Sequence, residues 1–213
     1  MPEQPKLVSL KGIFKFHSIA PSHDQSTTRP TYIFRSAQPY NVTDGDIRIL
    51  REIGITTIFD LRSDAEIVET SKAIPLRDLN DLKRVSVPVF ETSETNVTGR
   101  LMTYLQNDTQ TVMEAYARML AAGSKCFQLI FLHIRNKPEQ ACLIHCAIGK
   151  DRTGVAVALL LSLAGLTKQE IAEDYVLTNA GLEAYQPVVK KLLESMPRLW
   201  WDEDTIAAML SVR

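Results

Sequence analysis

Long apolar runs are missing from this chain of 213 residues. No run approaches the roughly 20 apolar residues that span a bilayer. The N-terminal residues 1–12 lack the apolar core of about 7–15 residues that marks a signal peptide. We therefore expect a cytoplasmic, soluble protein with no integral membrane segment.

Excess charge of one sign is also missing. Lysine and arginine together number 24, aspartate and glutamate 25, and the formal net charge is -1. Nucleic acids are bound mainly by clustered cations that neutralise phosphates. The balance of charge excludes nucleic acid as a bulk partner, so any basic feature must be local.

Cysteine is scarce, with only Cys126, Cys142 and Cys146. Their spacing fits neither a disulfide framework nor a zinc site, which indicates a reducing compartment. Cys142 precedes Cys146 by four positions. We interpret it as a core residue, and the alternative is a resolving partner for Cys146 under oxidation.

The composition is that of a folded domain. The hydrophobic content of 45% is enough for a full core at this length, so we expect a single domain over residues 1–213. Its polar, proline-bearing residues 1–7 are expected to form a disordered tail.

The pattern of secondary structure predicts the fold class. Short β-branched runs alternate with amphipathic segments, which is typical of an α/β fold with a central, mostly parallel sheet flanked by helices on both faces. Capping boxes at Thr43/Asp46, Ser63/Glu66 and Thr167/Glu170 predict three helix starts. Two further helices are expected over 109–122 and 124–134, broken at Gly123, and the first should turn Met113, Tyr116, Met119 and Leu120 inward.

The stretch 141–154, ACLIHCAIGKDRTG, organises the rest of the chain. Residues 141–144 read as a buried strand that ends at His145 and Cys146, and residues 155–161 as a buried helix. The first turn of a helix leaves backbone N–H groups unpaired, and these would point into the connecting loop. The pattern predicts an anion-binding loop whose backbone is supplied by Ala147, Ile148, Gly149 and Lys150.

The side chains of this stretch indicate what the loop does with an anion. The helix dipole and the cations Lys150 and Arg152 favour a thiolate at Cys146, which makes this residue the candidate nucleophile. The planar guanidinium of Arg152 suits two oxygens of a tetrahedral dianion. Thr153 offers a hydroxyl that could donate to the thiolate. The arrangement predicts phosphoryl transfer to sulfur.

These residues resemble a known signature. The segment from His145 to Gly154 is similar to the His-Cys-five residues-Arg motif of cysteine-dependent protein tyrosine and dual-specificity phosphatases, and most like the tyrosine/serine phosphatase family of fungi and bacteria. The resemblance implies the same α/β fold and the hydrolysis of phosphotyrosine, with phosphoserine and phosphothreonine as further substrates, through a cysteinyl-phosphate. Neither a metal nor a cofactor is expected, because Arg152 and the loop amides neutralise the phosphate.

The resemblance also implies supporting residues. His145 flanks the nucleophile, and Arg35 belongs to a Phe-Arg-Ser segment that lies near the active site in the family. We interpret Asp60 as a strand-end carboxylate that braces Arg35 or Arg62, and the alternative is a catalytic role. The chain departs from the family at residues 15–18, Lys-Phe-His-Ser, where relatives tend to read Asn-Phe-Arg-Asp.

Two carboxylates are candidates for the general acid that an alkoxide leaving group needs. Asp151 lies within the loop and is favoured. Glu91 follows a strand at 84–90, where relatives tend to carry aspartate.

Lys150 is compatible with two classes of substrate. A lysine at this position is shared with lipid phosphatases of the superfamily, which keeps an inositol phosphate or phosphoinositide as the alternative to a phosphorylated protein. Otherwise Lys150 only stabilises the thiolate and faces water. A catalytically silent domain that binds phosphorylated partners is a third interpretation, which the presence of both Cys146 and Arg152 disfavours.

Overall fold

The structure is a computed structural model that describes residues 10–19, 32–73, 77–79, 82–91, 109–179 and 182–194. The expected tail at residues 1–7 lies outside these ranges.

A five-stranded sheet forms the centre of the described chain. Its strands are β1 (His17–Ser18), β2 (Ile33–Ser36), β3 (Ile55–Asp60), β4 (Lys83–Ser86) and β5 (Ala141–His145). The order across the sheet is β1-β2-β5-β3-β4, with β1 antiparallel to β2 and every other pair parallel. The strand that carries the loop, β5, is therefore the middle strand.

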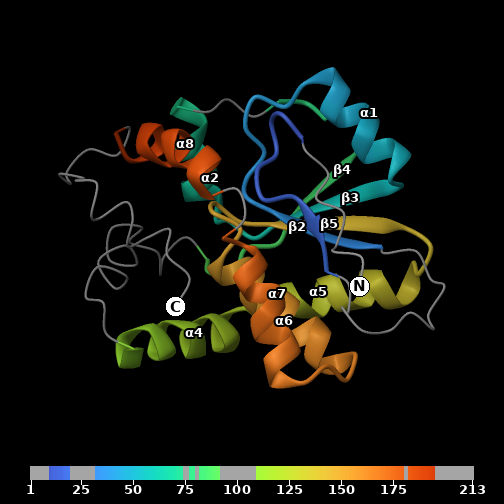
Figure 1. Cartoon of the computed structure of the whole chain (residues 1–213), viewed down its shortest axis with the longest axis vertical. Coiled ribbons are helices and arrows are strands. Elements are labelled where there is room, and N and C mark those ends of the chain that lie inside the picture. The colour runs from blue at the N-terminus through green and yellow to red at the C-terminus, as the bar shows by residue number, and fades with distance from the viewer. Residues whose placement is uncertain are drawn as a thin grey trace.

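Helices cover both faces of this sheet. They are α1 (Asp44–Glu52), α2 (Asp64–Ala73), α4 (Thr109–Ala122), α5 (Ser124–Asn136), α6 (Asp151–Leu163), α7 (Lys168–Leu177) and α8 (Leu182–Glu194). Figure 1 shows α1, α2 and α8 on one side of the sheet and α4 to α7 on the other. The predicted α/β class, with a mostly parallel sheet between two layers of helices, is confirmed.

The alternation of side chains along β5 explains the two layers. Successive residues of a strand point to opposite faces. Leu143 packs in one buried cluster with Ile47 and Leu50 of α1. The next residue, Ile144, packs in a second cluster with Phe127 of α5. A strand buried on both faces needs apolar side chains, as β5 has from Ala141 to Ile144.

Helix ends follow the local chemistry that the sequence predicts. Thr43 and Asp46 form a complete capping box at the start of α1, and Thr167 and Glu170 form one at α7. Gly54 follows α1 with a φ of +89°, a conformation that glycine adopts without strain. These predictions are confirmed because each depends on residues only a few positions apart.

The predicted break between α4 and α5 at Gly123 is also confirmed. The expected inward face of α4 is only partly right. Met119 is buried, but Met113 and Leu120 are 61% and 46% exposed. Helical periodicity identifies an apolar stripe, whereas the neighbours that cover it are set by tertiary packing.

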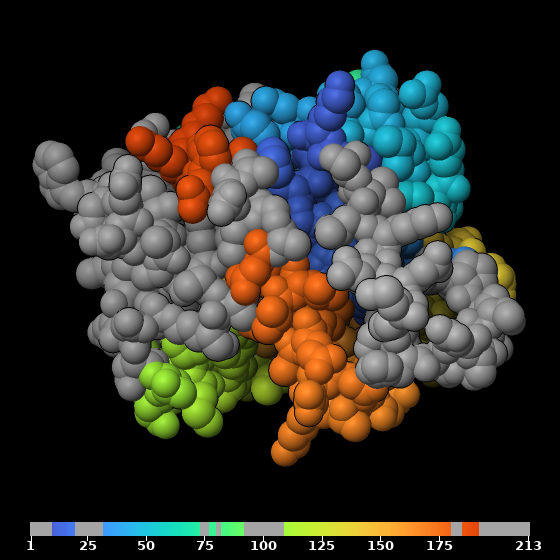
Figure 2. Space-filling view, in the orientation of Figure 1, coloured from blue at the N-terminus to red at the C-terminus, as the bar shows by residue number. Residues whose placement is uncertain are grey.

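The segment 10–19 lies on the molecular surface between α1 and α7, as the dark blue atoms of Figure 2 show. It nevertheless buries several side chains, including Ile13, Lys15 and His17. Within the described ranges, no helix combines the length and hydropathy that a membrane crossing requires.

His17 in this segment predicts acid sensitivity. Burial and the nearby charge of Arg35 lower the pKa of His17 from 6.5 to about 4. As the pH falls through 6.5 the unfolded chain binds a proton that the folded chain does not bind, so stability falls until about pH 4.

We expect His17 to remove roughly 2 kcal/mol from the free energy of unfolding between pH 7.5 and pH 5. Urea denaturation at the two pH values should show a smaller loss for His17→Phe than for the unaltered protein. Equal losses in the two proteins would contradict this assignment.

Candidate active site

The loop between β5 and α6 lies at the carboxyl edge of the sheet. β5 ends at His145, and α6 begins at Asp151. The parallel neighbours of β5 end beside it, because Ser36 of β2 and Asp60 of β3 are both paired with His145. Ligand sites of open α/β sheets lie at such edges, where several strands deliver side chains to one place.

Gly149 sets the path of this loop. Its φ is +74°, and a Cβ at this position would lie 2.3 Å from the carbonyl oxygen of Ser36. Only glycine permits both the conformation and the approach to the chain after β2. The loop therefore packs directly against the end of a neighbouring strand.

Hydrogen bonds hold two carbonyl groups of the loop. The carbonyl of Ala147 accepts from the Gln38 N–H at 3.1 Å and from the Tyr185 hydroxyl at 2.8 Å. The carbonyl of Gly149 accepts from the Arg35 guanidinium at 3.1 Å. In a trans peptide the N–H points away from the carbonyl, so the amides that follow these two carbonyls turn toward the opposite side.

The sulfur of Cys146 lies within the turn of the loop. The N–H of Gly149 donates to Sγ over 3.3 Å, and the Cys146 residue is only 3% exposed. The residue before α6, Lys150, makes no side-chain capping bond to the helix. α6 begins at Asp151, so the N-terminal end of this helix follows the sulfur-bearing residue by five positions.

Arg152 is held by a carboxylate from a distant helix. Its Nη1 and Nη2 atoms donate to the two oxygens of Glu66 at 2.7 and 2.9 Å, and both residues are buried. Glu66 also accepts from the N–H and hydroxyl of Ser63, which completes the predicted cap of α2. One carboxylate thus starts a helix and orients the guanidinium beside the loop.

Arg35 of β2 bonds both to the loop and to α7. It is 1% exposed, and its guanidinium donates to Asp174 of α7 at 2.7 Å as well as to the Gly149 carbonyl. Burial raises the pKa of Asp174, and the charge of Arg35 opposes that rise. Arg35 therefore connects α7, β2 and the loop.

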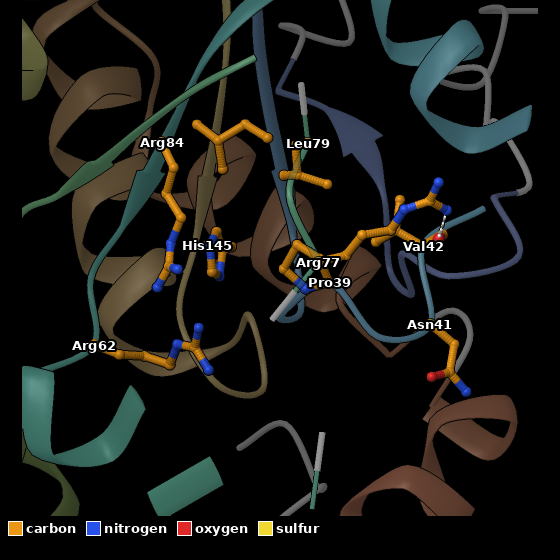
Figure 3. Close-up of a pocket in the computed structure, with 9 residues that line it drawn as sticks. Pro39, Asn41, Val42, Arg62, Arg77, Leu79, Arg84 and His145 are labelled. Carbon is orange, nitrogen blue, oxygen red and sulfur yellow. Dashed lines mark hydrogen bonds between the residues drawn. The ribbon is translucent and has the colours of Figure 1, made fainter. Parts of the chain in front are cut away.

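Asp60 braces Arg62 and not Arg35, the other partner that the sequence left open. The carboxylate accepts from Arg62 at 2.8 and 2.9 Å and also from Arg84 at 2.6 Å, and its Oδ2 lies 3.6 Å from Nε2 of His145. Figure 3 shows Arg62, Arg84 and His145 gathered on one side of a pocket.

The charges of this cluster determine how its members titrate. Burial alone would raise the pKa of Asp60, but the neighbouring His145, Arg62 and Arg84 lower it well below its usual range. Burial lowers the pKa of His145 to about 4, against the effect of Asp60. The imidazole is therefore neutral at pH 7, and the two guanidinium groups exceed the single carboxylate by one positive charge. Nδ1 of His145 donates to the Cys146 carbonyl at 3.1 Å, which orients the strand end.

Lys150 does not face water, so that interpretation was wrong. The residue is 4% exposed, and its Nζ lies 3.8 Å from the Asp151 carboxylate. Asp151 accepts a hydrogen bond from the Tyr116 hydroxyl at 2.6 Å, and Tyr116 in turn lies 2.7 Å from the Tyr175 hydroxyl. Burial and the Asp151 charge raise the pKa of Tyr116 well above its usual range, so Tyr116 acts as a donor to the carboxylate.

Three further candidate residues, Thr153, Glu91 and Cys142, have no bond to the Cys146 sulfur among the described residues. Thr153 is fully buried, and its hydroxyl has no hydrogen-bond partner within the described ranges, so the bond to the thiolate is not formed in this structure. Glu91 is exposed and lines a cavity between β4, α4 and α5 that includes no residue of the loop 146–152. Cys142 is fully buried, and burial raises its pKa to about 12.

A disulfide between Cys142 and Cys146 is not available to this geometry. Four residues of β-strand span about 13 Å, which exceeds the Cα separation that a disulfide bridges. All three cysteines are buried and free. The core interpretation of Cys142 is the one that the structure supports.

The sequence did not identify most of the side chains that bond to the loop and to the two arginines beside it. Glu66 was interpreted only as a cap, and no pattern in the sequence connects it with Arg152, which lies 86 positions away. Asp174 lies on α7, and nothing local in the sequence connects it with Arg35. Tyr116 and Tyr185 gave no signal beyond apolar periodicity.

Comparison with known proteins identifies the relatives of this chain. The family model described as "Tyrosine phosphatase family" matches residues 12–213. A tyrosine-protein phosphatase of Nostoc commune is 31% identical over 160 residues, which are 75% of this chain and 52% of that protein. The triple specificity protein phosphatase PtpB of Mycobacterium tuberculosis is 27% identical over 216 residues, covering 87% of this chain and 74% of PtpB.

A solved structure is similar at a lower level. TpbA of P. aeruginosa, crystallised in complex with pTyr, shares 16% identity with a TM-score of 0.38, covering 76% of this chain and 72% of that one. Because this TM-score is low, we assign the fold from the strand order of the sheet and not from this similarity. The chain spans about half the length of the Nostoc relative.

The pair formed by Glu66 and Arg152 predicts a large effect on stability. Glu66→Ala leaves a buried guanidinium without its carboxylate, which costs roughly 3–5 kcal/mol. Glu69→Ala, on the same helix, removes only the exposed pair with Lys72 and should cost at most about 1 kcal/mol. Urea denaturation measures both, and equal losses would show that the Glu66 pair contributes no more than a surface contact.

Proposed function

The chain belongs to the tyrosine phosphatase family, and from this premise we propose that it is a phosphomonoester hydrolase acting on phosphotyrosine in proteins through a cysteinyl-phosphate intermediate. The observation that carries the proposal is the loop 146–152. Its sulfur accepts an amide N–H, its carbonyls are held by outside donors, and its arginine is oriented by Glu66.

The first step transfers the phosphoryl group to sulfur. Sγ of Cys146 attacks phosphorus in line, so an S–P bond forms while the bond to the leaving oxygen breaks. The inward amides of the loop and the Arg152 guanidinium stabilise the charge on the equatorial oxygens. A preorganised donor of this kind is worth roughly 3–4 kcal/mol in the transition state.

The second step returns the enzyme to its starting state. Water attacks phosphorus, the S–P bond breaks, and inorganic phosphate leaves while the electron pair returns to sulfur. A carboxylate that protonated the leaving group in the first step would accept the proton of this water in the second.

Asp151 is the residue that we propose for this proton transfer. It is the first residue of α6, five positions after the sulfur, and its carboxylate is fixed by Tyr116. Glu91 lines a different cavity. The geometry therefore supports Asp151 over Glu91, which lies five positions beyond the end of β4.

Hydrolysis of an inositol phosphate or phosphoinositide is the second candidate. Lys150 is the residue that suggests it, because its ammonium lies at the loop, whereas its burial and its position 3.8 Å from the Asp151 carboxylate argue against contact with a second phosphate. The third interpretation, a silent phosphate-binding domain, lacks a comparable observation, since the nucleophile and arginine are both in place.

A substrate panel tests the proposed function. We expect turnover of a generic aryl phosphate and of a phosphotyrosine peptide, and loss of both in Cys146→Ser, measured as released phosphate. Faster hydrolysis of inositol phosphates than of any phosphopeptide would favour the second candidate. Absence of turnover on the whole panel, with phosphate binding retained, would favour the silent domain.

The assignment of the general acid gives a separate prediction. Asp151→Asn retains an oxygen that accepts from Tyr116 but loses the transferable proton. We expect the kcat for an alkyl phosphate to fall by about 10²-fold, and the kcat for a good aryl leaving group to fall much less. Glu91→Gln should leave both rates nearly unchanged. The reverse pattern would assign the role to Glu91.

A further inference from the structure

Lys15 is a buried lysine whose ammonium forms no hydrogen bond with any residue that the structure describes. The residue is 6% exposed, and its Nζ forms no hydrogen bond within the described part of the chain. It has a φ of +57°, an uncommon conformation for a residue with a side chain. Burying an ammonium without an anion costs free energy of desolvation. A ligand that brings negative charge to the ammonium would offset this cost.

The backbone places Lys15 beside the phosphate-binding loop. The carbonyl of the preceding Phe14 accepts from the N–H of Ala37, at the end of β2 against which the loop packs. Nζ of Lys15 lies 5.9 Å from the ring centroid of Tyr185, and the hydroxyl of Tyr185 donates to the Ala147 carbonyl. The segment is thus connected with the loop through two intermediate residues, Ala37 and Tyr185.

The guanidinium groups near the loop already have carboxylates. Arg152 is paired with Glu66, and Arg35 with Asp174, in both cases with the side chains buried. Lys15 differs because no salt bridge to it is formed within the described ranges. Among these three buried cations, Lys15 is the one whose charge the described part of the chain does not pair.

The charges that act on Lys15 are those of the loop and its support. Burial, together with the charges of Lys150 and Arg35, lowers the pKa of Lys15 to about 8, and the charges of Asp151 and Cys146 oppose this shift. The amine is therefore still mostly protonated at pH 7. A dianion bound in the loop would add negative charge to this surrounding and favour the ammonium.

We propose that Lys15 is a substrate-binding residue whose ammonium donates a hydrogen bond to an oxygen of the phosphoryl group held by the loop 146–152. The inference rests on the proposed function only in that this loop binds the phosphoryl group of a phosphate monoester. Bound phosphate then supplies the anion that the folded chain lacks, and Lys15 contributes to affinity and not to folding.

Binding of inorganic phosphate tests the proposal directly. In a Cys146→Ser background, which removes turnover, titration calorimetry at pH 7 measures the Kd for orthophosphate. Lys15→Met should raise this Kd by about tenfold or more, the effect of losing a charge-assisted hydrogen bond. Lys191→Met is the matched control, because Lys191 is exposed and its Nζ also lies 5.9 Å from a tyrosine ring, that of Tyr40. We expect no change in Kd for this control.

Thermal unfolding without phosphate separates binding from a structural role. Removing an unpaired buried charge should leave the Tm of Lys15→Met equal to that of its parent or higher. A fall in both Tm and phosphate affinity would show that the ammonium has a structural partner and would overturn the inference. Unchanged phosphate affinity would overturn it as well.

The outcome also separates this inference from the proposed function. Phosphate binding that is indifferent to Lys15 contradicts only the role of Lys15. Failure of the Cys146→Ser parent to bind orthophosphate contradicts the phosphate-binding loop itself, and the inference with it. Weaker binding by Lys15→Met, with the aryl phosphate turnover of the unaltered protein absent, supports Lys15 as a phosphate ligand and rejects the hydrolase.

Discussion

The path of the loop after β5 depends on bonds that hold its carbonyl groups away from the anion site. Ala147 accepts from two donors, one after β2 and one on α8, and Gly149 accepts from Arg35 of β2. Without these bonds the carbonyl oxygens could turn inward, where they would repel a phosphate. The sheet, α8 and α7 are therefore not only a scaffold under the loop. They determine which way the carbonyl groups of Ala147 and Gly149 point.

Buried ion pairs make this arrangement rigid. Arg152 and Arg35 each have a dedicated carboxylate, contributed by α2 and α7. A buried pair contributes little net stability, because desolvation offsets the attraction, but it fixes geometry. Such fixed donors lower the barrier for phosphoryl transfer, since they need no reorganisation when charge develops. Lys15 differs from these two arginines. The described chain provides no anion for its ammonium, and a bound phosphate would provide one.

Local chemistry was predictable from the sequence, and distant pairing was not. The strand, turn and helix around Cys146 follow from composition and spacing, and the capping boxes follow from residues three positions apart. Glu66 and Arg152 are 86 positions apart, and Arg35 and Asp174 are 139 apart. No periodicity connects residues at such separations, because their contact exists only once the sheet is assembled. The exposure of part of α4 was missed for the same reason, since periodicity does not reveal what packs on a helix.

The account depends on one claim, that sulfur at position 146 accepts the phosphoryl group. The direct measurement mixes the enzyme with a labelled aryl phosphate, stops the reaction with denaturant within the first turnover, and maps the label by peptide mass spectrometry. A phosphoryl group bonded to the Cys146 sulfur is the predicted result. Turnover with the label on another side chain, or with Cys146 replaced by alanine and the rate unchanged, would contradict the account.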